Sequence, residues 1–188
     1  MRVNWSLLCR ARFSSHQQEL ELSQNNCIYF VEGRCEEKLL NALKEQPQRI
    51  QPGRVKVFNV IQNTLPSSQL ITIQPGTTVA LVFDTDVPQI DCLKDNIGRL
   101  SKYCSKIKIV FLAQVLNFED ELVRCSDIRS ATDLTHSRSA KDFKRDFCAM
   151  SNTRAVLERV NLSVEKLWTE TPPSEFAFTP QNSDSVKQ

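Results

Sequence analysis

Short apolar runs recur along the chain at the spacing expected for the strands of a covered sheet. Each run is continuous and rich in β-branched and aromatic residues, which predicts strands buried on both faces, as in a parallel sheet. Pro-Gly pairs at residues 52–53 and 75–76 mark turns between them. The predicted strands lie within residues 27–31, 55–61, 79–83 and 107–112.

The segments between these runs change to helical periodicity. Leu39, Leu40 and Leu43 recur among charged residues until Pro47, and a second amphipathic stripe follows the third strand. Strands that alternate with helices predict an α/β fold, here a Rossmann-like four-stranded parallel sheet with helices on both faces and right-handed connections. The second stripe consists of Leu93, Ile97, Leu100 and Cys104.

One segment between the second and third strands allows two interpretations. Residues 67–73 contain enough β-branched side chains for a strand. Ser67, which follows Pro66, can equally cap a two-turn helix. We favour the helix.

Beyond residue 113 the strand signals stop and helical signals replace them. Asn117 can cap a helix with Asp120 in its first turn. Phe143, Phe147 and Met150 share one helical face, and a further helix is suggested within residues 151–160. The chain therefore divides into an N-terminal arm, an α/β core, a helical extension and an extended or disordered tail. These parts span residues 1–25, 26–125, 126–168 and 169–188.

The composition limits the class of protein without identifying a function. With 40% hydrophobic and 24% charged residues the chain has an ordinary globular composition, and its net charge of +2 does not by itself indicate nucleic-acid binding. Seven scattered cysteines without a C-x-x-C pair, and two isolated histidines, give poor support for a zinc site. No apolar run approaches membrane-spanning length. We expect reduced cysteines, a cytoplasmic location and no membrane association.

Acidic residues directly follow two of the predicted strands. Glu32 ends the first strand, and Asp84 and Asp86 end the third. Because ligands of an open parallel sheet gather beyond the carboxyl ends of its strands, these carboxylates are expected to face one crevice. They would repel one another unless a hard cation joined them, and Mg²⁺ prefers oxygen ligands while keeping several waters. A bound Mg²⁺ or Mn²⁺ would suit a nuclease, because it neutralises phosphate charge and orients an attacking water.

A simpler interpretation exists for a lone D-x-D motif after a strand. Such an aspartate often caps a helix or lies in a solvated turn. The Glu32-Gly33 pair at the end of another strand makes the acidic site the preferred hypothesis.

Two segments resemble the motifs of the Toprim family. Residues 28–36, with the sequence IYFVEGRCE, resemble its first motif, an apolar strand that ends in Glu-Gly with a further acid four residues on. Residues 81–86, LVFDTD, resemble its D-x-D motif. A weaker third stretch, residues 116–122 (LNFEDEL), is similar to small stand-alone Toprim proteins related to RloB and to overcoming-lysogenization-defect nucleases. The resemblance covers about residues 27–125.

This resemblance implies roles for individual acids. Glu32 would be the general acid or base, with Glu36 as an auxiliary acid near the metal. Asp84 and Asp86 would bind the metal, and Glu119 is a lesser candidate ligand. The expected activity is that of a Mg²⁺-dependent nuclease on DNA or RNA, and in that family such chains often serve defence against foreign genetic elements.

The resemblance also bears on other Toprim activities. Topoisomerases of this superfamily need a nucleophilic tyrosine on another domain, and primases usually need a zinc module. Tyr29 and Tyr103 both fall in predicted core elements. Neither activity is favoured.

A basic stretch in the helical extension supplies candidates for phosphate contacts. Arg138, Lys141, Lys144 and Arg145 include i+3 and i+4 spacings that place basic side chains on one helical face. A solvated helix face explains the same pattern. His136, nearby, is expected to be a solvated loop residue rather than a catalytic one.

Two other functions are compatible with the same residues. Residues 83–87 could be the nucleophile loop of a haloacid-dehalogenase-like phosphatase with a phospho-aspartate at Asp84, but that motif normally belongs to the first strand of its domain. The chain could also be a non-catalytic binding subunit of a larger defence or repair complex that uses the same acidic crevice. A protein partner or a homo-oligomer remains open in each case.

Overall fold

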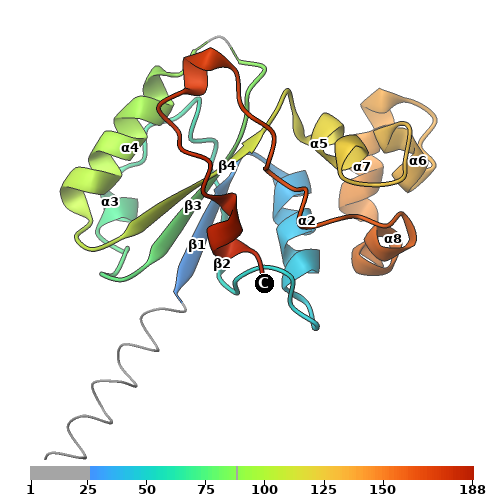
Figure 1. The fold of residues 1–188 in the computed structure, drawn as a ribbon, viewed down its shortest axis with the longest axis horizontal. Helices are drawn as coiled ribbons and strands as arrows, with labels where there is room; N and C mark the ends of the chain where they lie inside the picture. Colours follow the sequence, from blue (N-terminus) through green and yellow to red (C-terminus); the bar gives the residue numbers. More distant parts are fainter. Residues whose placement is uncertain (1–25, 88) are drawn as a thin grey trace, which may run out of the picture.

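The computed structural model describes residues 26–87 and 89–188, so the predicted N-terminal arm lies outside the described residues. One sheet of four parallel strands runs through this part in the order β2-β1-β3-β4 (Figure 1), which confirms the predicted α/β class. Within it, no helix is long and apolar enough to cross a membrane. The strands are β1 (Cys27–Val31), β2 (Arg54–Val57), β3 (Thr78–Asp84) and β4 (Lys108–Gln114).

The two central strands are the most completely buried strands of the sheet. Every residue of β1 and β3 is buried, as the continuous apolar runs predicted. The edge strand β2 is shorter than predicted, because Val60 and Ile61 leave the strand and are buried in the turn that follows. Gly53 is required where β2 begins, since a β-carbon there would lie 2.4 Å from the carbonyl oxygen of Cys27.

Helices cover both faces of the sheet (Figure 1). Successive strand residues point to opposite faces, so Tyr29 and Val82 join one apolar cluster while Phe30 and Leu81 join the other. The first cluster packs against α2 and the helical extension, and the second packs against α3 and α4. The helices are α2 (Arg34–Lys44), α3 (Ser67–Leu70), α4 (Asp91–Tyr103), α5 (Phe118–Arg124), α6 (Ala131–Thr135), α7 (Ala140–Ala149) and α8 (Thr153–Arg159).

The ambiguous segment is a helix, as favoured, but it is a single turn. Pro66 rather than Ser67 occupies the N-cap position of α3. Asn117 caps α5 as predicted, because its Oδ1 accepts a hydrogen bond of 3.1 Å from the backbone N–H of Asp120. Helix α6 was not anticipated.

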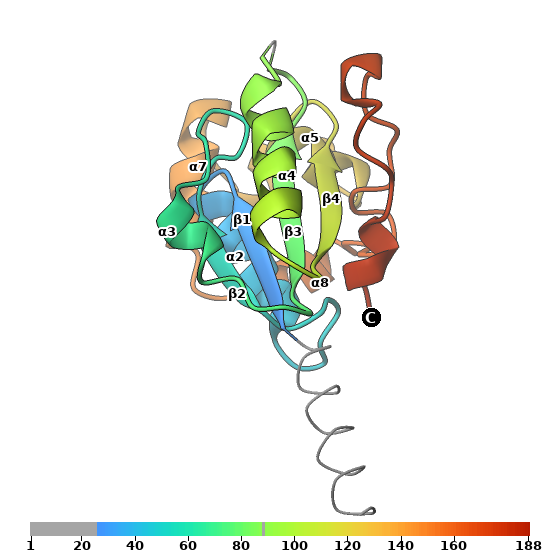
Figure 2. The ribbon, with the colours of Figure 1, turned by 90° about the vertical axis from the view of Figure 1, so that its left-hand side faces the viewer.

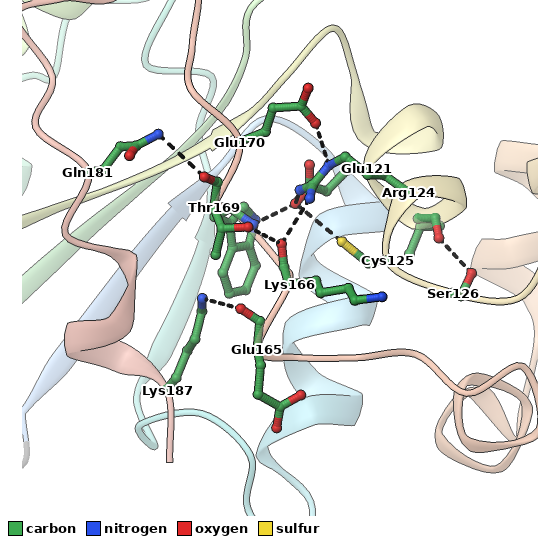
Figure 3. Close-up of polar contacts among 12 residues, drawn as sticks. Glu121, Arg124, Cys125, Ser126, Glu165, Lys166, Thr169, Glu170, Gln181 and Lys187 are labelled. Atoms are coloured by element: carbon green, nitrogen blue, oxygen red, sulfur yellow. Dashed lines mark hydrogen bonds and ion pairs between the residues drawn. The ribbon is translucent and has the colours of Figure 1, made fainter.

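The helical extension is held to the core by aromatic packing and by one buried carboxylate. Phe118 of α5 contacts Phe147 of α7, with ring centroids 5.5 Å apart. Oε1 of Glu121 accepts hydrogen bonds from the backbone N–H of Trp168 at 2.5 Å and from the guanidinium of Arg124 at 2.6 Å (Figure 3). These contacts join α5 to the segment that follows α8.

Residues 169–188, predicted as an extended or disordered tail, lie along the outer edge of β4 (Figure 2) and are called the C-terminal strap below. Phe176 of the strap is buried and stacks on Phe83, with ring centroids 5.7 Å apart. Because the segment is polar and Pro-rich overall, its composition did not reveal the few apolar residues that are buried. The strap contains two short 3-10 helices, η1 (Ser174–Phe176) and η2 (Ser183–Val186).

Candidate functional site

The ends of β1 and β3 bring two of the predicted acids together. Glu32 follows β1 and Asp84 is the last residue of β3, so both lie at the carboxyl edge of the sheet. Oε1 of Glu32 accepts a hydrogen bond of 3.1 Å from the backbone N–H of Asp84, and its Oε2 accepts one of 3.1 Å from the side-chain amide of Asn59. Both carboxylate oxygens of Glu32 are therefore oriented by the protein.

Asn59 is a site residue that the sequence did not reveal. Its Oδ1 accepts hydrogen bonds from the backbone N–H groups of Ile61 and Gln62, at 3.0 and 2.9 Å, which closes the turn after β2. An asparagine after a strand signals such a turn. Its amide contact with Glu32 depends on the pairing of β1 with β2, which local sequence does not show.

Glu36 is held at the start of α2. Its Oε2 accepts a hydrogen bond of 3.0 Å from the backbone N–H of Gly33, which satisfies a donor at the helix N-terminus. A β-carbon on Gly33 would lie 3.2 Å from this oxygen, so glycine leaves room for the carboxylate. Glu36 is buried, and burial raises its pKa while the charge of Lys144 acts in the opposite direction.

Asp84 is the most perturbed carboxyl group of the site. Its side chain is buried, and its Oδ1 has no hydrogen-bond partner among the described residues. Burial, followed by the charges of Glu32, Glu36 and Asp86, raises the pKa of Asp84 to about 8. Asp86 is exposed two residues further on. The site thus joins a buried and an exposed aspartate.

Gln114 is a second residue that the sequence did not reveal. It is the last residue of β4 and pairs in register with Asp84, so the two side chains leave the sheet on the same face. Gln114 is fully buried, and neither its amide oxygen nor its amide nitrogen has a partner within the described part of the chain. Buried polar atoms are nearly always hydrogen-bonded. Asp84 and Gln114 together therefore place three buried polar atoms without partners among the described residues on one face at the end of the sheet.

The helical extension adds a cation and another acid. Nζ of Lys144 in α7 lies 3.4 Å from Oε1 of Glu119 in α5. Partial burial lowers the pKa of Lys144, but the charges of Glu119, Glu36 and Asp84 outweigh this effect and raise it. Lys144 thus lies where its ammonium acts on Glu32, Glu36, Asp84 and Glu119. These four acids and Asp86 are called the acidic cluster below.

The other basic candidates lie on the surface around α7. Arg138 and Lys141 are exposed. Arg145 is paired with Asp142 at 3.0 Å and with Asp146 at 2.9 Å, so its charge is locally neutralised. Lys144 is accordingly the member of the basic set that the structure places at the carboxylates.

The aromatic and imidazole side chains lie away from the cluster. Tyr29 is buried and its hydroxyl donates a hydrogen bond of 2.7 Å to the carbonyl oxygen of Gln51. Tyr103 is the last residue of α4, a helix of the α/β core as predicted, but the residue is 59% exposed there and lies at the end of α4 away from the acids. His136 is exposed and ends α6 in a left-handed conformation.

A metal at these carboxyl oxygens would have to be one, such as Mg²⁺, that does not need a full shell of protein ligands. Within residues 26–87 and 89–188, no group of three or more His, Cys, Asp or Glu side chains is arranged to hold a metal ion directly. Mg²⁺ usually keeps several waters and takes one or two carboxylates together with substrate phosphates. Asp84, with an unpaired buried oxygen, and the neighbouring Asp86 fit that requirement.

Comparisons with protein-family models, with curated proteins and with solved structures give no match. Evidence for the function therefore comes from the chemistry of the side chains described above.

Proposed function

We propose that the acidic cluster is a Mg²⁺- or Mn²⁺-dependent site of the Toprim type that hydrolyses phosphodiester bonds of nucleic acid. The observation that carries this proposal is the buried Asp84, whose Oδ1 lacks a partner among the described residues and which lies beside Glu32 and Glu36. Burying carboxyl groups side by side costs free energy unless protons or a cation compensate their charge. A divalent cation provides that compensation and has a use in catalysis.

Asp84 and Asp86 would hold the metal, and Glu119 faces the same cluster from α5. When bound, Mg²⁺ neutralises charge on the phosphate and favours attack by water. Gln114 supports this assignment because its unpaired amide adjoins Asp84 and can hydrogen-bond to a hydrated ion.

Glu32, the proposed general acid or base, would act as the base. Its two hydrogen bonds, from Asp84 N–H and from Asn59, fix the orientation of the carboxylate. Burial raises the pKa of Glu32, which makes the ionised carboxylate a stronger base toward a water molecule. Glu36, tied to Gly33, adds negative charge nearby and further favours cation binding.

Lys144 would contact phosphate groups of the nucleic acid. An acidic site repels phosphate, so a nucleic acid can approach it only where cations offset that repulsion. The ammonium of Lys144 lies at the cluster, and the exposed Arg138 and Lys141 extend the basic surface along the same region. A role in defence against foreign genetic elements would be one use of such an activity.

The decisive experiment measures cleavage of single- and double-stranded DNA and RNA with Mg²⁺, with Mn²⁺ and with EDTA. Glu32→Gln and Asp84→Asn keep the shape of each side chain while removing its charge. We expect each to lower the cleavage rate by about 100-fold or more, as for loss of a general base or a metal ligand. Asp95→Asn, on the exposed face of α4, is the matched control and should cleave like the wild type.

The outcomes separate the alternatives. Metal-dependent cleavage that is lost in both site variants supports the nuclease. Metal-dependent binding without cleavage by the wild type supports a non-catalytic subunit of a larger complex. Equal cleavage by the wild type and both site variants rejects the assignment of the acidic cluster.

A further inference from the structure

The loop between β4 and α5 presents a strained, exposed leucine beside the D-x-D motif. Leu116 has a φ of 67°, in the left-handed region where its β-carbon approaches the backbone too closely. The residue is 54% exposed, so no burial of its side chain compensates for this conformation. Strained residues of this kind gather at ligand-binding sites, where the surrounding structure holds them in place.

Three hydrogen bonds lock Leu116 to the motif. Its carbonyl oxygen accepts from the backbone N–H groups of Thr85 and Asp86, both at 3.0 Å. Its own N–H donates to Oγ1 of Thr85 at 2.9 Å. The loop is therefore fixed relative to Asp84 and Asp86, and Leu116 is held next to the D-x-D motif.

Exposed apolar residues are placed unevenly over the described part of the molecule. Val57 ends β2 and Leu116 follows β4, so two of them flank the acids of the inner strands β1 and β3 at the carboxyl edge. With strands about 4.8 Å apart, the span from β2 to β4 is roughly 14 Å. The other two large exposed apolar residues, Ile71 and Tyr103, precede β3 and β4 and so lie toward the opposite edge.

We propose that Leu116 packs against the base of the nucleotide next to the bound phosphate. This inference rests on the proposed function and specifies its substrate class as single-stranded nucleic acid. A ligand that is bound through its phosphate alone would make no contact with apolar side chains beside the metal site. Bases that are unstacked offer flat apolar faces, whereas those of a duplex are covered by their neighbours.

The competing explanation is that Leu116 contacts no ligand, since single exposed apolar residues are common on protein surfaces. The effect of Leu116→Gly on binding separates the two explanations. Glycine and asparagine adopt a φ of this kind readily. If Leu116 has no ligand, Leu116→Gly should raise the melting temperature and change nothing else. If Leu116 contacts a base, the same substitution should keep or raise the melting temperature and weaken binding.

The test is fluorescence anisotropy with a labelled single-stranded DNA or RNA oligonucleotide, with Ca²⁺ in place of Mg²⁺ to slow cleavage. We expect Leu116→Gly and Leu116→Asn to bind about five- to tenfold more weakly than the wild type, as for losing contact with the exposed half of one leucine side chain. Ile71→Ala, which removes an exposed apolar side chain near the opposite edge, should bind like the wild type. An oligonucleotide of the same length with abasic sites should bind the wild type and Leu116→Gly equally.

Each result has a distinct meaning. If the wild type binds single strands while both Leu116 variants bind as tightly, this inference is overturned and the proposed function stands. If the wild type discriminates poorly between intact and abasic single strands, the inference is overturned even where a variant fails to fold. If the wild type neither binds nor cleaves any nucleic acid, the proposed function itself has failed.

Discussion

The carboxylate of Glu32 and the backbone N–H of Asp84 are joined by a hydrogen bond of 3.1 Å. The contact links the ends of two neighbouring strands, although the residues are 52 positions apart in the chain. It orients the predicted base and fixes its position relative to the predicted metal ligand. A substitution at either position is therefore expected to affect the other.

Asn59→Asp tests how much the hydrogen bond from the Asn59 amide to Glu32 contributes to the stability of the acidic cluster. The change keeps the oxygen that caps the turn at Ile61 but replaces the amide that donates to Glu32 with a second carboxylate. We expect the free energy of unfolding at neutral pH to fall by about 1–3 kcal/mol, because a hydrogen bond becomes a repulsive contact. Urea denaturation without divalent cations measures this change.

A double-mutant cycle provides the control for Asn59→Asp. In a Glu32→Gln background the neutral amide can donate to the new carboxylate, so most of the loss should disappear. An Asn59→Asp cost that is the same in both backgrounds would show that it arises in the turn at Ile61 and Gln62 instead.

The stability of the metal-free protein should depend on pH through Asp84. Its pKa in the folded protein, about 8, lies above its ordinary value of 3.8. Folding therefore favours the protonated form, and the associated stability is fully present below the ordinary pKa and lost as the pH rises through about 8. We expect the free energy of unfolding in EDTA to decrease between about pH 4 and pH 8. Asp84→Asn should flatten this decrease.

The same linkage predicts the pH dependence of Mg²⁺ stabilisation. A metal binds the ionised carboxylates, so it must displace protons at low pH. Mg²⁺ should raise the melting temperature more at pH 8 than at pH 5 in the wild type and much less in Asp84→Asn. A pH-independent effect of Mg²⁺ would indicate that the ion binds away from the acidic cluster.

The sequence was informative where a residue's position follows from its own strand. Glu32 and Asp84 end apolar runs, and parallel strands bring their carboxyl ends to one edge, so their proximity could be predicted. Asn59, Gln114 and Lys144 reach the same edge through strand register and helix packing. Those are tertiary relationships, and a single sequence carries no local signal of them.

The C-terminal strap illustrates the same limit on a larger scale. Its composition indicates an extended chain, and only Phe176 and Val186 are fully buried large apolar residues there. Besides these two residues, Asn182 holds the strap by pairing with the edge of β4. An edge strand needs such cover, but the sequence does not say which segment supplies it.

Asn182→Ala should loosen the strap at β4. Oδ1 of Asn182 accepts from the N–H of Phe111 at 2.8 Å, and its amide donates to the carbonyl oxygen of Ile109 at 2.9 Å. Loss of both bonds should lower the free energy of unfolding by about 1–3 kcal/mol and accelerate hydrogen exchange at the Phe111 amide. Gln181→Ala, whose side-chain contacts are exposed and 3.3–3.4 Å long, should leave that exchange unchanged.

Cys35 and Cys148 should form a disulfide under mild oxidation. Their sulfur atoms lie 3.5 Å apart and belong to α2 and α7, the helices that carry Glu36 and Lys144. Cys148 is half-buried and reached by solvent, whereas burial raises the pKa of the Cys35 thiol. Oxidised glutathione should therefore react first at Cys148. Cys35 then displaces the bound glutathione, so two protein thiols are oxidised while one glutathione disulfide is reduced to two thiols.

The product should be a protein two hydrogen atoms lighter, with Cys35 and Cys148 in one cross-linked peptide after digestion. Since 113 positions separate the two residues, the cross-link should raise the free energy of unfolding by about 4 kcal/mol by restricting the unfolded chain. Cys148→Ser should show neither effect, while Cys92→Ser, at another partly accessible cysteine, should retain both. Glutathione that remained attached to Cys148 would show that the two helices hold the sulfur atoms too rigidly to form the disulfide.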